Sequence, residues 1–263
     1  MRTVIIFTIA IVAAYFLITT KGGDFKARGE NLFGFFINEN NRFSQTTLLS
    51  NTEKTTPFVF ENRSLIAGFR PEIRPYAPHL DIATAHASII LDADSGDVLY
   101  ENDADERRQI ASLTKLFTAT LVIERVKNLD ELVTIDEEAI YSEGTRIGCP
   151  RSGFCNGVRL KIGEQISVRD LLKAALMNSA NDAAIALSKH IGQTQAGFVR
   201  MMNERVSELG LQNTHFCTPS GLEPDGRENE CYSSARDVAQ ITAHALKYDI
   251  LWDMMRLEKT FIT

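Results

Sequence analysis

The sequence predicts a mixed α/β domain, in which an antiparallel sheet is combined with a cluster of helices. Two short apolar strands, at Ala87–Leu91 and Asp97–Tyr100, flank the segment Asp92–Gly96, whose Asp, Ser and Gly residues are typical of a hairpin turn. Helical patterns dominate after the hairpin, up to about Lys247. We expect the sheet to be incomplete, because two early strands are followed by a helical middle and the sequence ends at Thr263 before further strands.

Composition is that of a globular protein. The chain has 263 residues, of which 44% are hydrophobic and 24% are charged, so it is long enough to bury a core. The formal net charge is -6, which provides no basic field to attract nucleic acid. The sequence also contains no glycine-rich phosphate loop of the Walker type.

The N-terminus contains an uncharged run from Val4 to Thr20. Its length is at the short end for a membrane span and slightly long for the core of a cleaved signal, and no Ala-x-Ala follows it. We expect residues 1–21 to be an uncleaved signal anchor, with a signal peptide as the alternative. Residues 22–80 are polar and lack sustained periodicity, which predicts a linker before a domain at 81–263.

The four cysteines form two close pairs, Cys149 with Cys155 and Cys217 with Cys231, each in a predicted loop. Close pairs in loops suit an exported protein in an oxidising compartment. Three pairings of four cysteines are possible, and we expect the local one. A zinc site is the alternative, but neither pair has Cys-x-x-Cys spacing, so we expect no metal.

Several helices follow the hairpin. The segment from Ser112 to Val126 carries apolar residues on most of its circumference, which predicts a deeply buried helix. Ser167 and Ser234 each precede an apolar run with Asp three residues later, a typical helix start. The other predicted helices are the one that Ser167 begins, with its apolar run at Leu171–Met177, then Asp182–His190, Ala196–Leu209 and the one that Ser234 begins.

Ser112 and Lys115 form a Ser-x-x-Lys pair at the start of a predicted helix. Side chains at i and i+3 lie one turn apart, so a serine nucleophile and a lysine base come within reach of each other without a histidine. The pattern alone is weak, because a chain of this size contains about one match by chance. Ser112 could instead cap the helix, and Lys115 could be solvated. However, a lysine in a first turn opposes the helix dipole, and the apolar neighbours indicate burial.

Ser179-Ala180-Asn181 is a second polar element between two apolar helical segments. Ser and Asn are common helix caps, so the triplet could simply start the next helix. Buried polar side chains need partners, and a cleft shared with Ser112 would provide them. We therefore expect a second hydroxyl and a carboxamide at the same site.

With these elements in order, the chain resembles the low-molecular-mass penicillin-binding proteins, D-alanyl-D-alanine carboxypeptidases of the serine peptidase and β-lactamase superfamily. The resemblance covers about Ala85 to Lys247 and rests on five ordered blocks. These are Leu91–Tyr100, Ala111–Leu116, Leu172–Ala184, Pro219–Leu222 and Ser233–Asp237. It implies a β-lactamase/transpeptidase-like fold.

The resemblance also implies a role for each residue. Ser112 attacks the carbonyl of the terminal D-Ala-D-Ala bond, and its own N–H is one oxyanion donor. Lys115 takes the serine proton and must be neutral, which requires burial to lower its pKa from about 10.4 toward about 8. Ser179 relays a proton to the leaving amine, and Asn181 orients the substrate amide.

One element of the family is not found. A Lys-Thr-Gly motif should supply a lysine for the substrate carboxylate and a second oxyanion donor, but Lys259-Thr260 is followed by Phe261. We expect the sequence to stop before this motif, so that residues 81–263 form part of the domain and are inactive alone.

The implied function is a serine-type D-Ala-D-Ala carboxypeptidase that trims peptidoglycan stem peptides and is inhibited by β-lactams. Alternatives are a D,D-endopeptidase, a β-lactamase, or a non-catalytic membrane-tethered peptidoglycan binder. A β-lactamase would need a deacylating glutamate, and Glu204, Glu208 and Glu223 lack the Glu-x-x-Leu-Asn context. We expect no cofactor and no nucleic-acid partner, and a location in the bacterial cell envelope, outside the cytoplasmic membrane.

Overall fold

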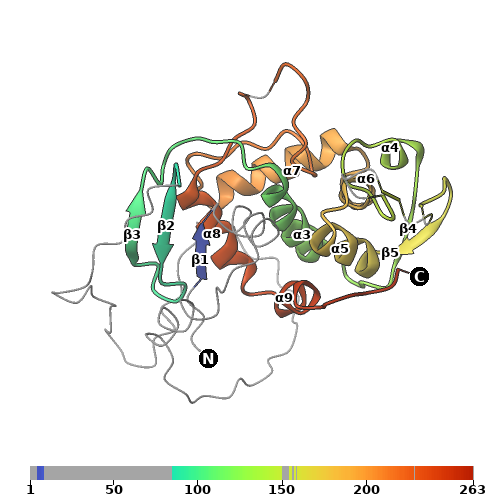
Figure 1. Ribbon diagram of the computed structural model, residues 1–263, viewed down its shortest axis with the longest axis horizontal. Coiled ribbons are helices and arrows are strands. Elements are labelled where there is room, and N and C mark those ends of the chain that lie inside the picture. Colours follow the sequence, from blue (N-terminus) through green and yellow to red (C-terminus); the bar gives the residue numbers. More distant parts are fainter. Residues whose placement is uncertain are drawn as a thin grey trace, which may run out of the picture. The chain divides into compact units, whose positions relative to one another are not determined.

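The computed structural model describes residues 5–8, 85–149, 154–155, 157, 159–227 and 229–262 (Figure 1). The predicted linker at 22–80 lies outside the described residues. The chain divides into two compact units, residues 1–106 and 107–263. In the described part of the chain, no helix is both long and apolar enough to span a bilayer.

The first unit contains a three-stranded antiparallel sheet in the order β1-β2-β3. Strand β1 is Ile5–Thr8, β2 is Ser88–Leu91 and β3 is Val98–Asn102. Ile5 lies opposite Leu91, and Ser88 lies opposite Asn102. The remainder of the apolar segment that contains β1 is outside the described residues, so the assignment of 1–21 as an anchor or signal stays a prediction.

The predicted hairpin between β2 and β3 is confirmed. Asp92 Oδ1 accepts hydrogen bonds from the backbone N–H groups of Asp94 (3.1 Å) and Ser95 (2.7 Å). Gly96 has φ of 77°, a left-handed conformation that glycine adopts without steric cost. The Asp side chain and the glycine together close the turn.

The second unit is mainly helical. In chain order its described elements are η1 (Ala111–Leu113), α3 (Thr114–Arg125), β4 (Leu132–Thr134), α4 (Glu137–Ile140), β5 (Gln165–Ser167), α5 (Val168–Met177), α6 (Asn181–Gly192), α7 (Gln195–Glu208), α8 (Ala235–Ala245) and α9 (Asp249–Met255). Strands β4 and β5 pair antiparallel, with Val133 opposite Ile166.

Side-chain caps fix the starts of three helices. The hydroxyls of Ser167, Thr194 and Ser234 accept hydrogen bonds from the backbone N–H three residues later, at 3.1, 2.9 and 3.1 Å. The predicted starts at Ser167 and Ser234 are confirmed, because each hydroxyl satisfies an otherwise unpaired first-turn donor. Helix α8 ends at Ala245, whereas the sequence predicted an end at about Lys247.

Helix α3 lies at the centre of the second unit, in contact with α5, α6, α7 and α8 (Figure 1). Phe117, Leu121 and Val122 are at most 2% exposed, and the ring of Phe117 stacks on that of Phe216 at 4.8 Å. The predicted deep burial of this helix is therefore confirmed. A helix held from all sides gives the residues at its start a fixed position.

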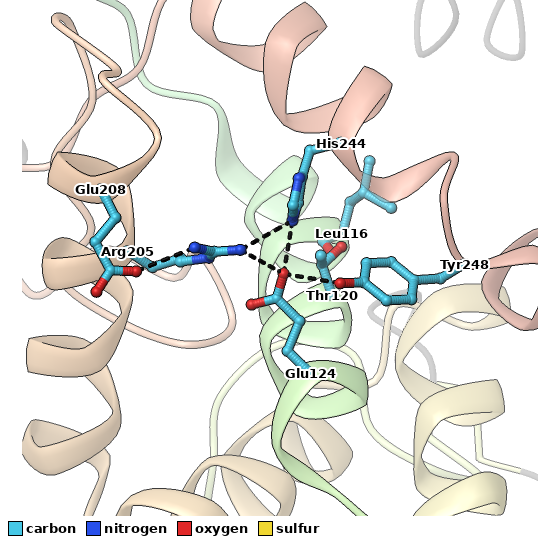
Figure 2. Close-up of polar contacts among 7 residues, drawn as sticks. All are labelled: Leu116, Thr120, Glu124, Arg205, Glu208, His244 and Tyr248. Atoms are coloured by element: carbon cyan, nitrogen blue, oxygen red, sulfur yellow. Dashed lines mark hydrogen bonds and ion pairs between the residues drawn. The ribbon is translucent and has the colours of Figure 1, made fainter. Parts of the chain in front are cut away.

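A polar cluster holds the C-terminal part of α3 (Figure 2). One carboxylate oxygen of Glu124, Oε1, contacts Arg205 Nη2 of α7 at 2.9 Å, His244 Nε2 of α8 at 2.6 Å and the hydroxyl of Tyr248 at 3.0 Å. Burial alone would raise the pKa of Glu124, but hydrogen bonds from His244 and Arg205 and their charges lower it to about 2. The cluster joins α3 to two neighbouring helices.

Candidate active site

Ser112 lies in the 3-10 turn η1, directly before α3, and is exposed. Neither η1 nor α3 has a side-chain cap, so the alternative interpretation of Ser112 as an N-cap is wrong. A 3-10 turn has three residues per turn, which aligns residues i and i+3. Lys115 Nζ accordingly donates a hydrogen bond to Ser112 Oγ at 3.1 Å.

Lys115 is buried, with 3% of its surface exposed. Its Nζ also donates to the backbone carbonyl of Ser220 at 2.8 Å. Burial lowers the pKa of Lys115 to about 8, although the nearby charge of Asp182 acts to raise it. At a pKa of about 8, roughly a tenth of the amine is neutral at pH 7. The alternative of a solvated Lys115 is wrong, and the expected lowering of its pKa is present.

Ser179 lies in the connection between α5 and α6, and its Oγ donates to Ser112 Oγ at 2.9 Å. Ser112 Oγ is thus contacted by an amine and a second hydroxyl. Ser179 has φ of 55° and Ala111 has φ of 44°, two left-handed conformations at residues other than glycine. Backbone strain of this kind concentrates at functional sites, where the surrounding structure maintains it.

Asn181 is the first residue of α6, and the N-cap position is Ala180. The triplet therefore does start the next helix, as the alternative had it, but no side chain caps that helix. Its Nδ2 donates to the carbonyl of Glu143 at 2.7 Å, and its backbone N donates to the carbonyl of Thr145 at 2.7 Å. These two bonds hold a loop from the β4–β5 region against the start of α6.

Asp182 directly follows Asn181 at the start of α6, and no pattern in the sequence predicted a role for it. It is 2% exposed, and its carboxylate accepts hydrogen bonds from the backbone N–H groups of Ile147 (3.0 Å) and Ala183 (2.8 Å). Burial raises its pKa to about 6, against these hydrogen bonds and the charge of Arg146, which lower it. The available signal was a carboxylate within an otherwise apolar helix start.

The segment Pro219–Gly221 forms another wall of the site. Thr118 Oγ1 donates to the carbonyl of Pro219 at 2.7 Å, one turn after the Lys115 contact with Ser220. Gly221 has φ of 74°, and a Cβ atom there would lie 1.9 Å from the carbonyl oxygen of Ala111. Only glycine permits this approach. The sequence cannot reveal such a contact, since Ser220 contributes only its backbone oxygen.

An open cleft of about 620 Å3 lies next to Ser112. Ser112 and Asn181 line it, together with Gly221, Arg146 and Arg159. The structure pairs Cys149 with Cys155 and Cys217 with Cys231, which are the local pairings expected from the sequence, and the first pair also lines the cleft. Over the described residues, no group of three or more His, Cys, Asp or Glu side chains is arranged to hold a metal ion.

A serine hydroxyl between a buried lysine and a second serine is the arrangement of a Ser-Lys nucleophile, in which the lysine replaces the histidine of a catalytic triad. Residues 74–262 match the D-alanyl-D-alanine carboxypeptidase family, and the chain belongs to this family.

Individual relatives agree with the family. The chain is 37% identical over 182 residues to the D-alanyl-D-alanine carboxypeptidase DacC of Escherichia coli, an alignment that covers 69% of this chain and 43% of the relative. The crystal structure of the D-alanyl-D-alanine carboxypeptidase DacD from Francisella tularensis matches with a TM-score of 0.58 and 32% identity, over 72% of this chain and 43% of that one. The structure of penicillin-binding protein 5 from Haemophilus influenzae matches with a TM-score of 0.55 and 34% identity, over 62% of this chain and 45% of that one.

The fold is therefore the β-lactamase/transpeptidase-like fold of these proteins, as predicted. The chain spans less than half the length of these relatives.

Proposed function

We propose that this protein is a serine-type D-Ala-D-Ala carboxypeptidase that removes the terminal D-alanine from peptidoglycan stem peptides. The observation that carries the proposal is the position of Ser112 Oγ, 3.1 Å from the buried Lys115 Nζ and 2.9 Å from Ser179 Oγ, at the edge of an open cleft. Membership of the carboxypeptidase family supports the substrate class.

In the acylation step, neutral Lys115 takes the proton of Ser112 Oγ while that oxygen forms a bond to the carbonyl carbon between the two D-alanines. The carbonyl becomes an oxyanion, toward which the backbone N–H of Ser112 can donate a hydrogen bond. Lys115 is buried and has a lowered pKa, so its neutral form is accessible near neutral pH.

Collapse of the tetrahedral intermediate breaks the C–N bond and leaves an acyl-Ser112 ester. In this mechanism Ser179 relays the proton from Lys115 to the leaving amine, a role supported by the contact of its hydroxyl with Ser112 Oγ. Asn181 orients the substrate amide, a role supported by its position in the lining of the cleft. A water molecule then attacks the ester, its proton returns to Ser112 Oγ, and the shortened peptide is released.

Penicillin labelling tests this proposal, because a β-lactam acylates the same serine and the adduct persists. In the protein expressed from its complete gene, a fluorescent penicillin should label the wild type and the Ser207→Ala variant, but not Ser112→Ala. Ser207 is an exposed serine of α7 and serves as the matched control. Release of D-alanine from a D-Ala-D-Ala peptide should follow the same pattern. Equal labelling of the wild type and Ser112→Ala would refute the assignment.

We further propose a location in the bacterial cell envelope, where the substrate is found. Residues 1–21 would serve as a signal anchor or signal peptide and residues 22–80 as a linker to the domain that begins at residue 81. The support is the uncharged run at 4–20 and the family's carboxypeptidase relatives.

A further inference from the structure

Two arginines line the cleft on the side of the disulfide-bridged loop. Arg146 and Arg159 both face the cleft that contains Ser112, and Cys149 and Cys155 line it between them in sequence. A cleft of about 620 Å3 has the size of sites for drug-sized ligands. It therefore accommodates more of a peptide than its two terminal alanines.

Both arginines are held in place. The backbone of Arg146 exchanges two hydrogen bonds with Cys149, at 2.9 and 3.0 Å, and its Nη1 donates to the carbonyl of Ile140 at 3.0 Å. Arg159 is exposed, and its Nη2 contacts Cys155 Sγ at 3.3 Å. Among the described residues, neither guanidinium forms an ion pair with a carboxylate. Glu143 also lines the cleft, and the charge of Arg146 acts to lower the pKa of the buried Asp182. Guanidinium groups with free donors bind carboxylates strongly, often through two hydrogen bonds.

The position of this pair relative to Asn181 indicates which part of a substrate it meets. Asn181 holds the loop that contains Glu143 and Thr145, and Arg146 is the next residue of that loop. In the proposed function Asn181 orients the substrate amide. We place this amide on the acyl side of the scissile bond, so that the loop beyond Asn181 faces residues that precede that bond.

We propose that Arg146 and Arg159 form a subsite for a carboxylate on the side chain of the residue that precedes the terminal D-Ala-D-Ala. This inference rests on the proposed function and adds a substrate preference to it. Peptides with an anionic side chain at that position are the preferred substrates, and neutral ones bind less well.

Two substrates that differ in one charge test the subsite. They are Nα-acetyl-Nε-succinyl-Lys-D-Ala-D-Ala, with a side-chain carboxylate, and Nα,Nε-diacetyl-Lys-D-Ala-D-Ala, without one. The ratio of their kcat/KM values is measured in the protein expressed from its complete gene, at low ionic strength, where screening is weak. In the wild type we expect a ratio of about 10, the scale of a charge-assisted hydrogen bond.

The variants then locate the effect. In R146Q/R159Q the ratio should fall to about 1. In R159E it should also fall to about 1, because the introduced carboxylate cancels the charge of Arg146 and the net charge of the pair drops from +2 to zero. The exposed Arg200 of α7 provides the matched control, and R200Q should keep the wild-type ratio. Each ratio is taken within one variant, so a general change in activity cancels.

Three results would overturn the inference. They are a wild-type ratio of 1 or less, an unchanged ratio in R159E, and an equal loss on both substrates, which would assign the arginines to the terminal carboxylate instead. Failure of the proposed function gives a different result, since neither substrate would then release D-alanine and penicillin would not label Ser112.

Discussion

Lys115 combines two properties that a general base needs, contact with the nucleophile and a lowered pKa. Its Nζ lies 3.1 Å from Ser112 Oγ, and burial brings its pKa to about 8. We predict that Lys115→Ala slows acylation by penicillin about 100- to 10,000-fold, the usual scale for loss of a general base. Stopped-flow fluorescence with a labelled penicillin measures the rate, with Lys127→Ala, an exposed lysine just after α3, as the control. A rate near that of the wild type would move the base function to another group.

The charge of Asp182 affects the pKa of Lys115 without a direct hydrogen bond between the two side chains. Its carboxylate raises the pKa of Lys115, while Ser112 Oγ and the carbonyl of Ser220 are the neutral partners of Nζ. With a pKa of about 6, Asp182 is ionised at the pH where Lys115 titrates. In Asp182→Asn this negative charge is absent, so the pKa of Lys115 should fall below 8.

In the proposed mechanism the acylation rate rises with pH as Lys115 loses its proton. This rise should therefore shift to lower pH in Asp182→Asn. The pH profile of the second-order acylation rate constant measures the shift, because it reports the pKa values of the free enzyme. Circular dichroism checks that the variant is folded. A rise at the wild-type pH would show that Asp182 serves only to hold Ile147.

Residue types at fixed spacing made the proposed nucleophile predictable. Ser112 and Lys115 are three residues apart, and the structure joins them directly. The contribution of Ser220 was not predictable, because a backbone carbonyl has no signature in the sequence. The same holds for Arg146 and Arg159, whose role depends on the path of a loop.

At the scale of elements, the Pro219–Gly221 segment and the η1 turn support each other. Gly221 approaches Ala111 so closely that any side chain would collide with its carbonyl oxygen. We predict that Gly221→Ala abolishes penicillin labelling, because the backbone around Ser112 must move.

Gly210→Ala is the matched control for this prediction. Gly210 has φ of 71°, close to the 74° of Gly221, but no atom lies within 4 Å of a Cβ built there. Both variants incur the cost of a left-handed alanine, about 1–2 kcal/mol. Only Gly221→Ala should lose labelling, and retained labelling would show that the turn tolerates the displacement.

The Glu124 cluster predicts a pH dependence of stability. The pKa of Glu124 falls from 4.5 to about 2 on folding, so the ionised form is favoured in the native state. This contribution is fully present above pH 4.5 and is lost as the pH falls toward about 2. The contribution to the free energy of unfolding is about 3 kcal/mol, because a shift of one pKa unit corresponds to about 1.36 kcal/mol.

We therefore predict that Glu124→Gln lowers the free energy of unfolding by about 3 kcal/mol at pH 7 and by much less near pH 2. Urea denaturation at both pH values measures the difference, with the exposed Glu204→Gln of α7 as the control. An equal loss at both pH values would mean that the ionised carboxylate does not stabilise the fold.

Helices with long apolar stripes and side-chain caps were predictable within about two residues, as α5 and α8 show. Strands β4 and β5 have three residues each, too few for a periodic pattern. Helix α4, with four residues, was missed for the same reason.

At the scale of the whole molecule, one local hairpin, a central buried helix and the order of the motifs were enough to predict the fold class. The wall of the cleft between β4 and β5 was not predictable, because contacts such as Asn181 with Glu143 join residues 38 positions apart. Such contacts depend on packing of the whole unit rather than on local sequence.

The two disulfides indicate an oxidising cellular compartment for this protein. Cys149–Cys155 and Cys217–Cys231 each close a short loop, and each bridge should stabilise the fold by about 2–3 kcal/mol. Such bonds form in the cell envelope and not in a reducing cytoplasm. We therefore predict that both are present in the exported protein.

Peptide mapping tests this prediction and the pairing together. Arg151 lies between Cys149 and Cys155, and Arg227 lies between Cys217 and Cys231, so trypsin separates the two cysteines of each pair. After alkylation without reductant, all four cysteines should be unmodified and each pair should appear as two linked peptides that separate on reduction. Linked peptides in another combination would contradict the pairing. Alkylation of all four cysteines in the denatured, unreduced protein would place the chain in a reducing compartment and remove the support for a role in the envelope.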